Sequence, residues 1–144
     1  KAVLVLTNTV DSEMMPLVSI LKERLRDTDV VYLTRWANRE ERAAMKSMIG
    51  NPKRKTVLCA TYSLFQMGIN IPSLENVLLY SPSGSVIRVL QSIGRVMRQK
   101  ALCFVYDLID THGDQNNSLA EKRMTIYNEA YGSQFSVENA SISL

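Results

Sequence analysis

The sequence predicts an α/β fold, in which helices cover both faces of an open, parallel β-sheet. Short apolar runs of strand length alternate with stretches of helical periodicity along the chain. The apolar runs are nearly continuous, as is typical of strands that are buried on both faces of a parallel sheet. Right-handed crossovers through the intervening helices would connect such strands. We therefore expect one covered sheet, and a single domain over residues 1–144.

Five apolar runs are the predicted strands. They lie at residues 2–6, 30–33, 56–60, 76–80 and 102–108. In open parallel sheets, ligands bind beyond the carboxyl ends of the strands. The residues expected at those ends are mostly polar and rich in hydroxyl groups: Thr7, Asn8, Thr34, Arg35, Thr61, Ser81 and Asp110.

The first predicted helix follows a start signal at residues 11–12. Its apolar residues have spacings of four, three and four, which place them on one helix face: Met14, Val18, Leu21 and Leu25. Pro16 falls near the first turn, where proline costs a helix least.

Three more helices are predicted. The second begins at Asn38, where Glu41 completes a variant of the capping box, and we expect it to stop at Gly50. The third spans residues 85–97 and the last residues 119–131.

The composition is that of an ordinary globular domain, with 46% hydrophobic and 22% charged residues. No apolar run is long enough to span a bilayer and the start does not resemble a signal peptide, so we expect no membrane partner. Cys59 and Cys103 lie in apolar runs, which indicates buried free thiols in a reducing, cytoplasmic location. With one histidine and no CxxC pair, no metal site is expected. The net charge of +3 is compatible with phosphate binding without demonstrating it.

The helix at residues 85–97 has a basic face. Opposite an apolar stripe, spacings of three, four and three align Arg88, Gln91, Arg95 and Arg98. A solvated basic surface is the ordinary interpretation of such a face. Two features argue against it: the set has no acidic partner within the helix, and Gly94 costs a helix about 1 kcal/mol relative to alanine. Gly94 therefore indicates a close approach or an early helix end.

Three stretches of this sequence resemble motifs of superfamily 2 helicases. QSIGRVMR at residues 91–98 resembles motif VI, QxxGRxxR. CAT at 59–61, followed by QMGINIP at 66–72, resembles motif V, and residues 3–8 resemble motif IV. The order is that of the family, so the chain resembles the C-terminal, RecA-like domain of a DExH-type helicase. KRMTIY at 122–127 is similar to the phage and repair branch, the UvsW-like group.

The resemblance implies an ATP site that is shared between two lobes. The chain contains neither GxxxxGK nor a DExH or DEAD box, so ATP with Mg²⁺ would be bound mainly by an N-terminal lobe that is absent here. The chain opens on Lys1 without an initiator Met, which we interpret as a part of a longer protein, although a processed chain would look the same. The fragment alone should be inactive.

The family's roles are carried onto the matching positions of this chain. Arg95 and Arg98 would be arginine fingers, and Gln91 would hold the attacking water or a phosphate oxygen. Gly68, Asn70 and Gly94 would line the nucleotide site. Asn70 stands where the family often has Asp against the ATP ribose, and an amide can still donate and accept there.

Nucleic acid, DNA rather than RNA, is the expected second partner. Thr61, Thr7 and Asn8 would hold phosphates without reading bases, and Arg35 would add a salt-sensitive contact. Arg39 and residues 53–55 fit a solvated surface better.

Two alternatives remain. One is a nucleic-acid-binding or regulatory module of the same fold without ATPase activity. The other is a dinucleotide-binding enzyme, which is disfavoured because residues 7–12, the first strand–helix turn, contain no glycine. These residues do not themselves distinguish DNA from RNA. Strand polarity, and unwinding as against annealing or branch migration, cannot be read from them either.

Overall fold

The computed structural model describes residues 1–67, 71, 74–81, 94, 102–108, 114–132, 135–138 and 140. The chain divides into two compact units, unit 1 at Lys1–Ile109 and unit 2 at Asp110–Leu144. The expectation of a single domain over residues 1–144 stays a prediction.

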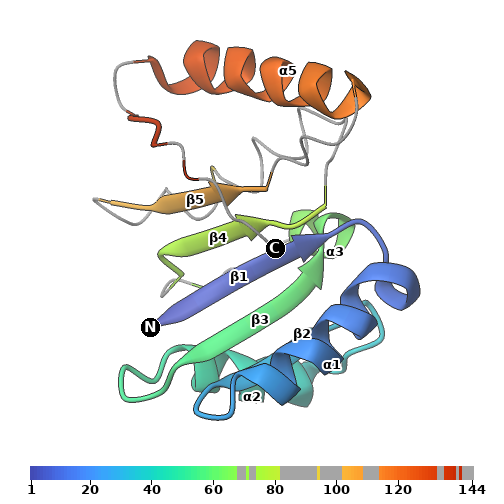
Figure 1. Cartoon of the computed structure of the whole chain (residues 1–144). Coiled ribbons are helices and arrows are strands. Elements are labelled where there is room, and N and C mark those ends of the chain that lie inside the picture. The colour runs from blue at the N-terminus through green and yellow to red at the C-terminus, as the bar shows by residue number, and fades with distance from the viewer. Residues whose placement is uncertain are drawn as a thin grey trace. The chain divides into compact units, whose positions relative to one another are not determined.

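The described part of unit 1 contains one five-stranded sheet in which all pairs of neighbours are parallel. Its strands are β1 (Ala2–Thr7), β2 (Asp29–Leu33), β3 (Thr56–Thr61), β4 (Asn76–Leu79) and β5 (Phe104–Asp107). Their order across the sheet is β2-β3-β1-β4-β5, as Figure 1 shows. The predicted open parallel sheet is confirmed, and β4 and β5 are shorter than the apolar runs that predicted them.

Three helical segments of unit 1 agree only in part with the predicted helices: η1 (Val10–Met14), α1 (Met15–Arg24) and α3 (Tyr62–Gln66). The first, a π-helix, leads directly into α1, which has Pro16 in its first turn as predicted. The short helix α3 follows β3 and was not predicted. Of the helix predicted at residues 85–97, only Gly94 lies within the described residues, and its backbone is helical.

The second predicted helix is confirmed as α2 (Arg39–Ile49), together with its capping box. The Glu41 backbone N–H donates to Asn38 Oδ1 over 2.8 Å, and the Asn38 N–H donates to Glu41 Oε2 over 2.8 Å. Gly50 ends the helix as predicted, but in a right-handed conformation with φ −71°. Its freedom to adopt a left-handed φ is therefore not what ends the helix.

Unit 2 contains the helix α5 (Asp114–Tyr131), which starts five residues before the predicted residue 119. Tyr127 on this helix meets Phe135 edge to face, with ring centroids 6.4 Å apart. Such an arrangement matches the positive edge of one ring to the negative face of the other. It ties the end of α5 to the segment that follows.

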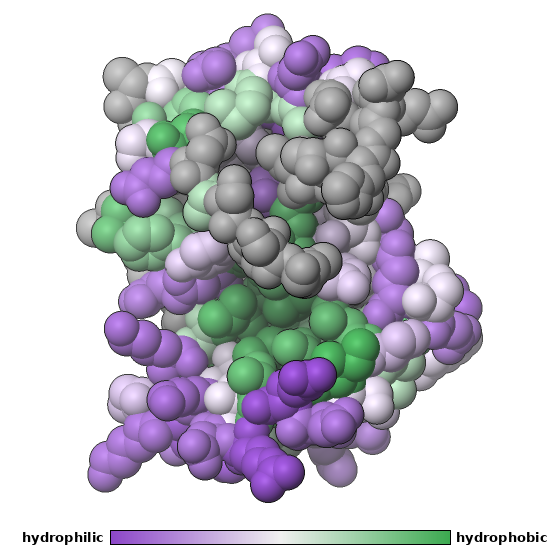
Figure 2. Space-filling view, viewed as in Figure 1, coloured by the Kyte–Doolittle hydropathy of each residue, from purple (hydrophilic) through white to green (hydrophobic). Residues whose placement is uncertain are grey.

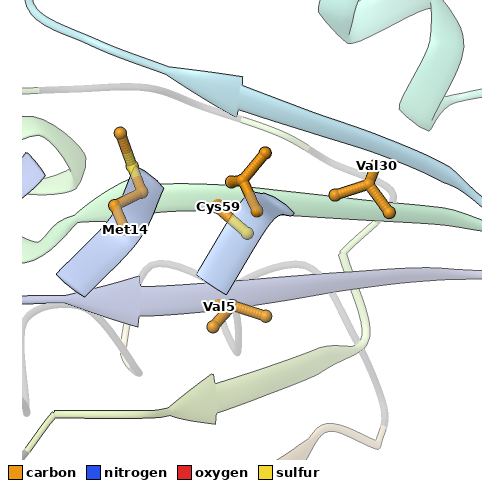
Figure 3. Close-up of a cluster of buried hydrophobic side chains, with 5 residues drawn as sticks. Val5, Met14, Val30 and Cys59 are labelled. Carbon is orange, nitrogen blue, oxygen red and sulfur yellow. The ribbon is translucent and has the colours of Figure 1, made fainter. Parts of the chain in front are cut away.

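Alternating residues of the strands form a core on one face of the sheet. Val5, Val30 and Cys59 point to the same side, where they pack with Met14 of η1 and Val18 of α1 (Figure 3). Burial raises the pKa of the Cys59 thiol to about 11, so the thiol is neutral. On the viewed face of unit 1, Figure 2 shows an apolar area bordered by hydrophilic side chains.

The opposite face of the sheet buries the other alternating set, including Leu4, Leu6 and Leu58, none of which is more than 1% exposed. Burial of apolar side chains on both faces is what the nearly continuous apolar runs predict. The edge strand β5 departs from this pattern, because Phe104 and Tyr106 are each 50% exposed. Cys103, directly before β5, is only partly buried, so the prediction of two buried thiols holds for Cys59 alone.

Candidate functional site

The carboxyl ends of β1 and β3 lie side by side, with Thr7 in register with Thr61. Thr7 is fully buried, and its hydroxyl donates to the Thr9 carbonyl over 3.2 Å. Thr61 is 6% exposed, and its hydroxyl caps α3 by accepting from the Leu64 N–H over 3.3 Å. Both hydroxyls therefore contribute to local structure, and their predicted contacts with nucleic acid stay predictions.

Beyond the end of β1, two successive backbone N–H groups converge on one carboxylate oxygen. The N–H groups of Asn8 and Thr9 donate to Glu13 Oε2 over 2.7 and 3.1 Å. Ser81, which follows β4, donates its hydroxyl hydrogen to the same oxygen over 2.7 Å. Successive N–H groups of this kind form a concave site for an anion, and here the protein's own carboxylate occupies it. Asn8, a predicted phosphate contact, is exposed, but its backbone N–H is already bonded to Glu13.

The π-helix explains why Glu13 reaches this position. In an ordinary capping box, the carboxylate stands three residues after the N-cap and bonds back to the N-cap N–H. Thr9 is the N-cap of η1, and Glu13 stands four residues after it. The wider π turn, in which the Met14 N–H bonds to the Thr9 carbonyl over 3.2 Å, accommodates the extra residue. Sequence reasoning missed Glu13 because its spacing from the cap is not the usual one.

The turn after β2 presents two neighbouring side chains to solvent. Arg35, a predicted phosphate contact, is exposed, and its guanidinium carbon lies 4.3 Å from the centroid of the Trp36 ring. Trp36 itself is 78% exposed. The turn is closed by a hydrogen bond from the Ala37 N–H to the Thr34 carbonyl over 3.1 Å. Sequence reasoning passed over Trp36, and its neighbour Arg35 was the signal that could have found it.

The residues predicted for the ATP site lie largely outside the described residues: Gln91, Arg95, Arg98, Gly68 and Asn70. Gly94 is described, and apart from Gly94 itself, its chain neighbours and the backbone of its own helix, no described atom lies within 4 Å of the position where a Cβ would stand. Among the described atoms, then, nothing requires glycine there through a close approach. No group of three potential metal-ligating side chains is found in the described part of the chain, and none of its helices is long and apolar enough to cross a membrane.

Comparison with known proteins gives three findings. Residues 1–100 match the model of the family described as Helicase conserved C-terminal domain. The ATP-dependent DNA helicase uvsW of Enterobacteria phage T4 is 35% identical over 101 residues, which is 68% of this chain and 20% of that protein. The chain therefore spans about a fifth of the length of this curated relative.

Among solved structures, the C-terminal part of the Fun30 ATPase domain matches with a TM-score of 0.67 at 14% identity. The match covers 84% of this chain and 38% of that chain. At this identity the likeness shows the fold, an α/β sheet of the RecA-like type.

Proposed function

Because this chain belongs to the family of helicase conserved C-terminal domains, we propose that it is the second RecA-like lobe of an ATP-dependent DNA helicase or translocase. The observation that carries the proposal is the family match over residues 1–100, which includes all three motif stretches. The relative at 35% identity is a DNA helicase by name, which supports DNA over RNA. A role in DNA repair or recombination is part of the proposal.

In this proposal, the chain completes an ATP site whose larger part lies on another lobe. Arg95 and Arg98 would bind phosphate oxygens, which planar guanidinium groups match with paired hydrogen bonds. Gln91, Gly68, Asn70 and Gly94 would contribute amide and backbone contacts. These donors suit a triphosphate, whereas Mg²⁺ prefers carboxylate oxygens, which we assign to the other lobe. Bound ATP would supply the phosphoanhydride bond whose hydrolysis drives movement along the strand.

The carboxyl edge of the sheet is the proposed path of the nucleic acid. Backbone N–H groups and hydroxyls there can hold phosphates without reading sequence. The register of Thr7 with Thr61, and the bond between Asn8 and Ser81, bring the ends of three strands together at this edge. The exposed Arg35 extends the edge with a positive charge.

The arginine roles can be tested in the intact protein. We expect Arg95→Ala or Arg98→Ala to lower DNA-stimulated ATP turnover by about 10³–10⁵-fold, because an arginine finger stabilises charge that develops in the transition state. Nucleotide binding, measured by equilibrium titration, should remain largely in place. Arg24→Ala is the matched control, since Arg24 is an exposed arginine in the last turn of α1.

Wild-type turnover in both variants would contradict the arginine-finger role. An intact protein that binds DNA but shows no ATP turnover would instead favour the binding or regulatory module.

A further inference from the structure

We propose that Trp36, with Arg35 stacked on it, is a base-stacking site for single-stranded nucleic acid. The inference rests on the proposed function, because it assumes that a strand passes the carboxyl edge of the sheet. It adds a contact of a different kind: the proposed edge contacts hold phosphates, whereas an indole ring binds the face of a base.

The exposure of Trp36 is the first support. Tryptophan is highly buried on average, because its ring has a large apolar area. Trp36 is 78% exposed and lies on the turn directly after β2, so unit 1 does not use this ring in its core. Arg35 lies over the ring at 4.3 Å from its centroid, and because Trp36 is still 78% exposed, the ring keeps surface for a planar ligand.

The turn that presents the ring is held on both sides. The Thr34–Ala37 hydrogen bond closes it, and α2 begins immediately afterwards with its capping box. Arg42 reaches back from α2 and donates from Nε to the Ala37 carbonyl over 3.0 Å. The cation–π contact with Arg35 further restricts the ring. A ring ordered in advance loses little conformational entropy when a base stacks on it.

The charges near the ring favour a polyanion over an apolar protein surface. Residues 34–46 contain four cationic side chains and two acidic ones. Glu41, one of the acidic pair, is bonded to the Asn38 N–H. A surface depression on α2 is lined by Arg39, Arg42, Ala43 and Lys46. An exposed aromatic ring combined with a positively charged surface is the combination that binds single strands independently of sequence.

The position of the turn fits a strand that also passes β3 and β1. β2 is the edge strand beside β3, and Leu33 at its end is in register with Ala60. Neighbouring strands are about 4.8 Å apart, so the end of β2 lies about two spacings, roughly 10 Å, from the end of β1. One extended strand can therefore span from phosphate contacts at β1 and β3 to the ring beyond β2.

The test compares two single-stranded DNA probes of equal length on the intact protein: oligothymidine, and the same backbone with abasic residues. Dissociation constants are measured by fluorescence anisotropy for the wild type and for Trp36→Ala, Trp36→Phe and Tyr32→Ala. Tyr32 is the matched control, because it is another exposed aromatic residue, within β2 itself, and has a cation over its ring, Lys22 Nζ at 5.8 Å. It precedes the carboxyl edge.

We expect Trp36→Ala to weaken binding of oligothymidine about 5- to 150-fold, the range for loss of one stacked base. Binding of the abasic probe should change little, Trp36→Phe should restore most of the affinity, and Tyr32→Ala should behave as wild type. Arg35→Ala should also reduce the slope of log affinity against log salt by about 0.7, whereas Trp36→Ala should leave that slope unchanged.

Equal losses on both probes, or wild-type binding of oligothymidine by Trp36→Ala, would overturn the stacking site while leaving the proposed function in place. If the wild-type intact protein binds neither probe, the proposed function fails, and the stacking site fails with it.

Discussion

The ends of β1 and β2 differ in what they leave available to a ligand. At the end of β1, the N–H groups of Asn8 and Thr9 are bonded to Glu13, and the Thr7 hydroxyl is buried. At the end of β2, Arg35 and Trp36 are exposed. The first end has the donors that bind phosphate but already holds an internal anion. The second has a ring and a charge that the fold of unit 1 leaves in solvent.

This difference shows that a polar residue at a strand end is not by itself a binding group. What matters is whether its hydrogen-bond donors already have a partner within the fold. Where they do, an incoming phosphate must displace that partner. For the β1 end this partner is the Glu13 carboxylate, and a strand that binds there must compete with it. At the β2 end, the Arg35 guanidinium lies over the Trp36 ring, but the residue is still 78% exposed, so a base can stack without displacing an internal anion.

The largest effect on this contrast is expected from Glu13→Ala. The substitution removes the acceptor that the Asn8 and Thr9 N–H groups share, and each such hydrogen bond contributes about 0.5–1.5 kcal/mol. The Asn8 N–H keeps a second acceptor, the Ser81 hydroxyl oxygen at 3.3 Å, so the Thr9 amide should show the larger change. Native-state hydrogen exchange of these two amides in the intact protein should accelerate accordingly. Glu13→Gln is the matched control, because it keeps an acceptor oxygen at the same reach, and its effect should be smaller. Unchanged protection in Glu13→Ala would show that the β1 end is not held by this carboxylate.

A smaller effect is expected from Asn38→Ala, which removes the side chain that caps α2. Loss of such a cap typically costs about 1 kcal/mol, so the Glu41 amide should exchange several times faster. Trp36→Ala is the comparison. Substitution of an exposed side chain usually changes the free energy of unfolding by no more than about 0.5 kcal/mol, so the Glu41 amide should keep its protection against exchange. A large loss of protection in Trp36→Ala would mean that the ring stabilises the fold, which would contradict the difference between the ends of β1 and β2.

The parts of the fold that depend on local patterns were predictable. The strands follow from apolar runs, and the capping box of α2 follows from Asn38 and Glu41, three residues apart. Each of these signals is contained within a few consecutive residues, so no knowledge of the tertiary structure is needed to recognise it.

The features that sequence reasoning missed depend on distant contacts or on short segments. The bond between Ser81 and Glu13 joins residues 68 positions apart, and only the pairing of β1 with β4 brings them together. The five-residue helix α3 is too short to show a periodicity. Trp36 had no predicted role, and its exposure could not be read from its residue type, because tryptophan is highly buried on average.

The central claim is that this chain completes an ATP site whose activity depends on nucleic acid. Its most direct test is the rate of phosphate release from ATP by the intact protein, measured with and without single-stranded DNA. We expect turnover to rise severalfold or more with DNA and to saturate with DNA concentration. The same low rate with and without DNA, in a protein shown to bind both ATP and DNA, would contradict the claim.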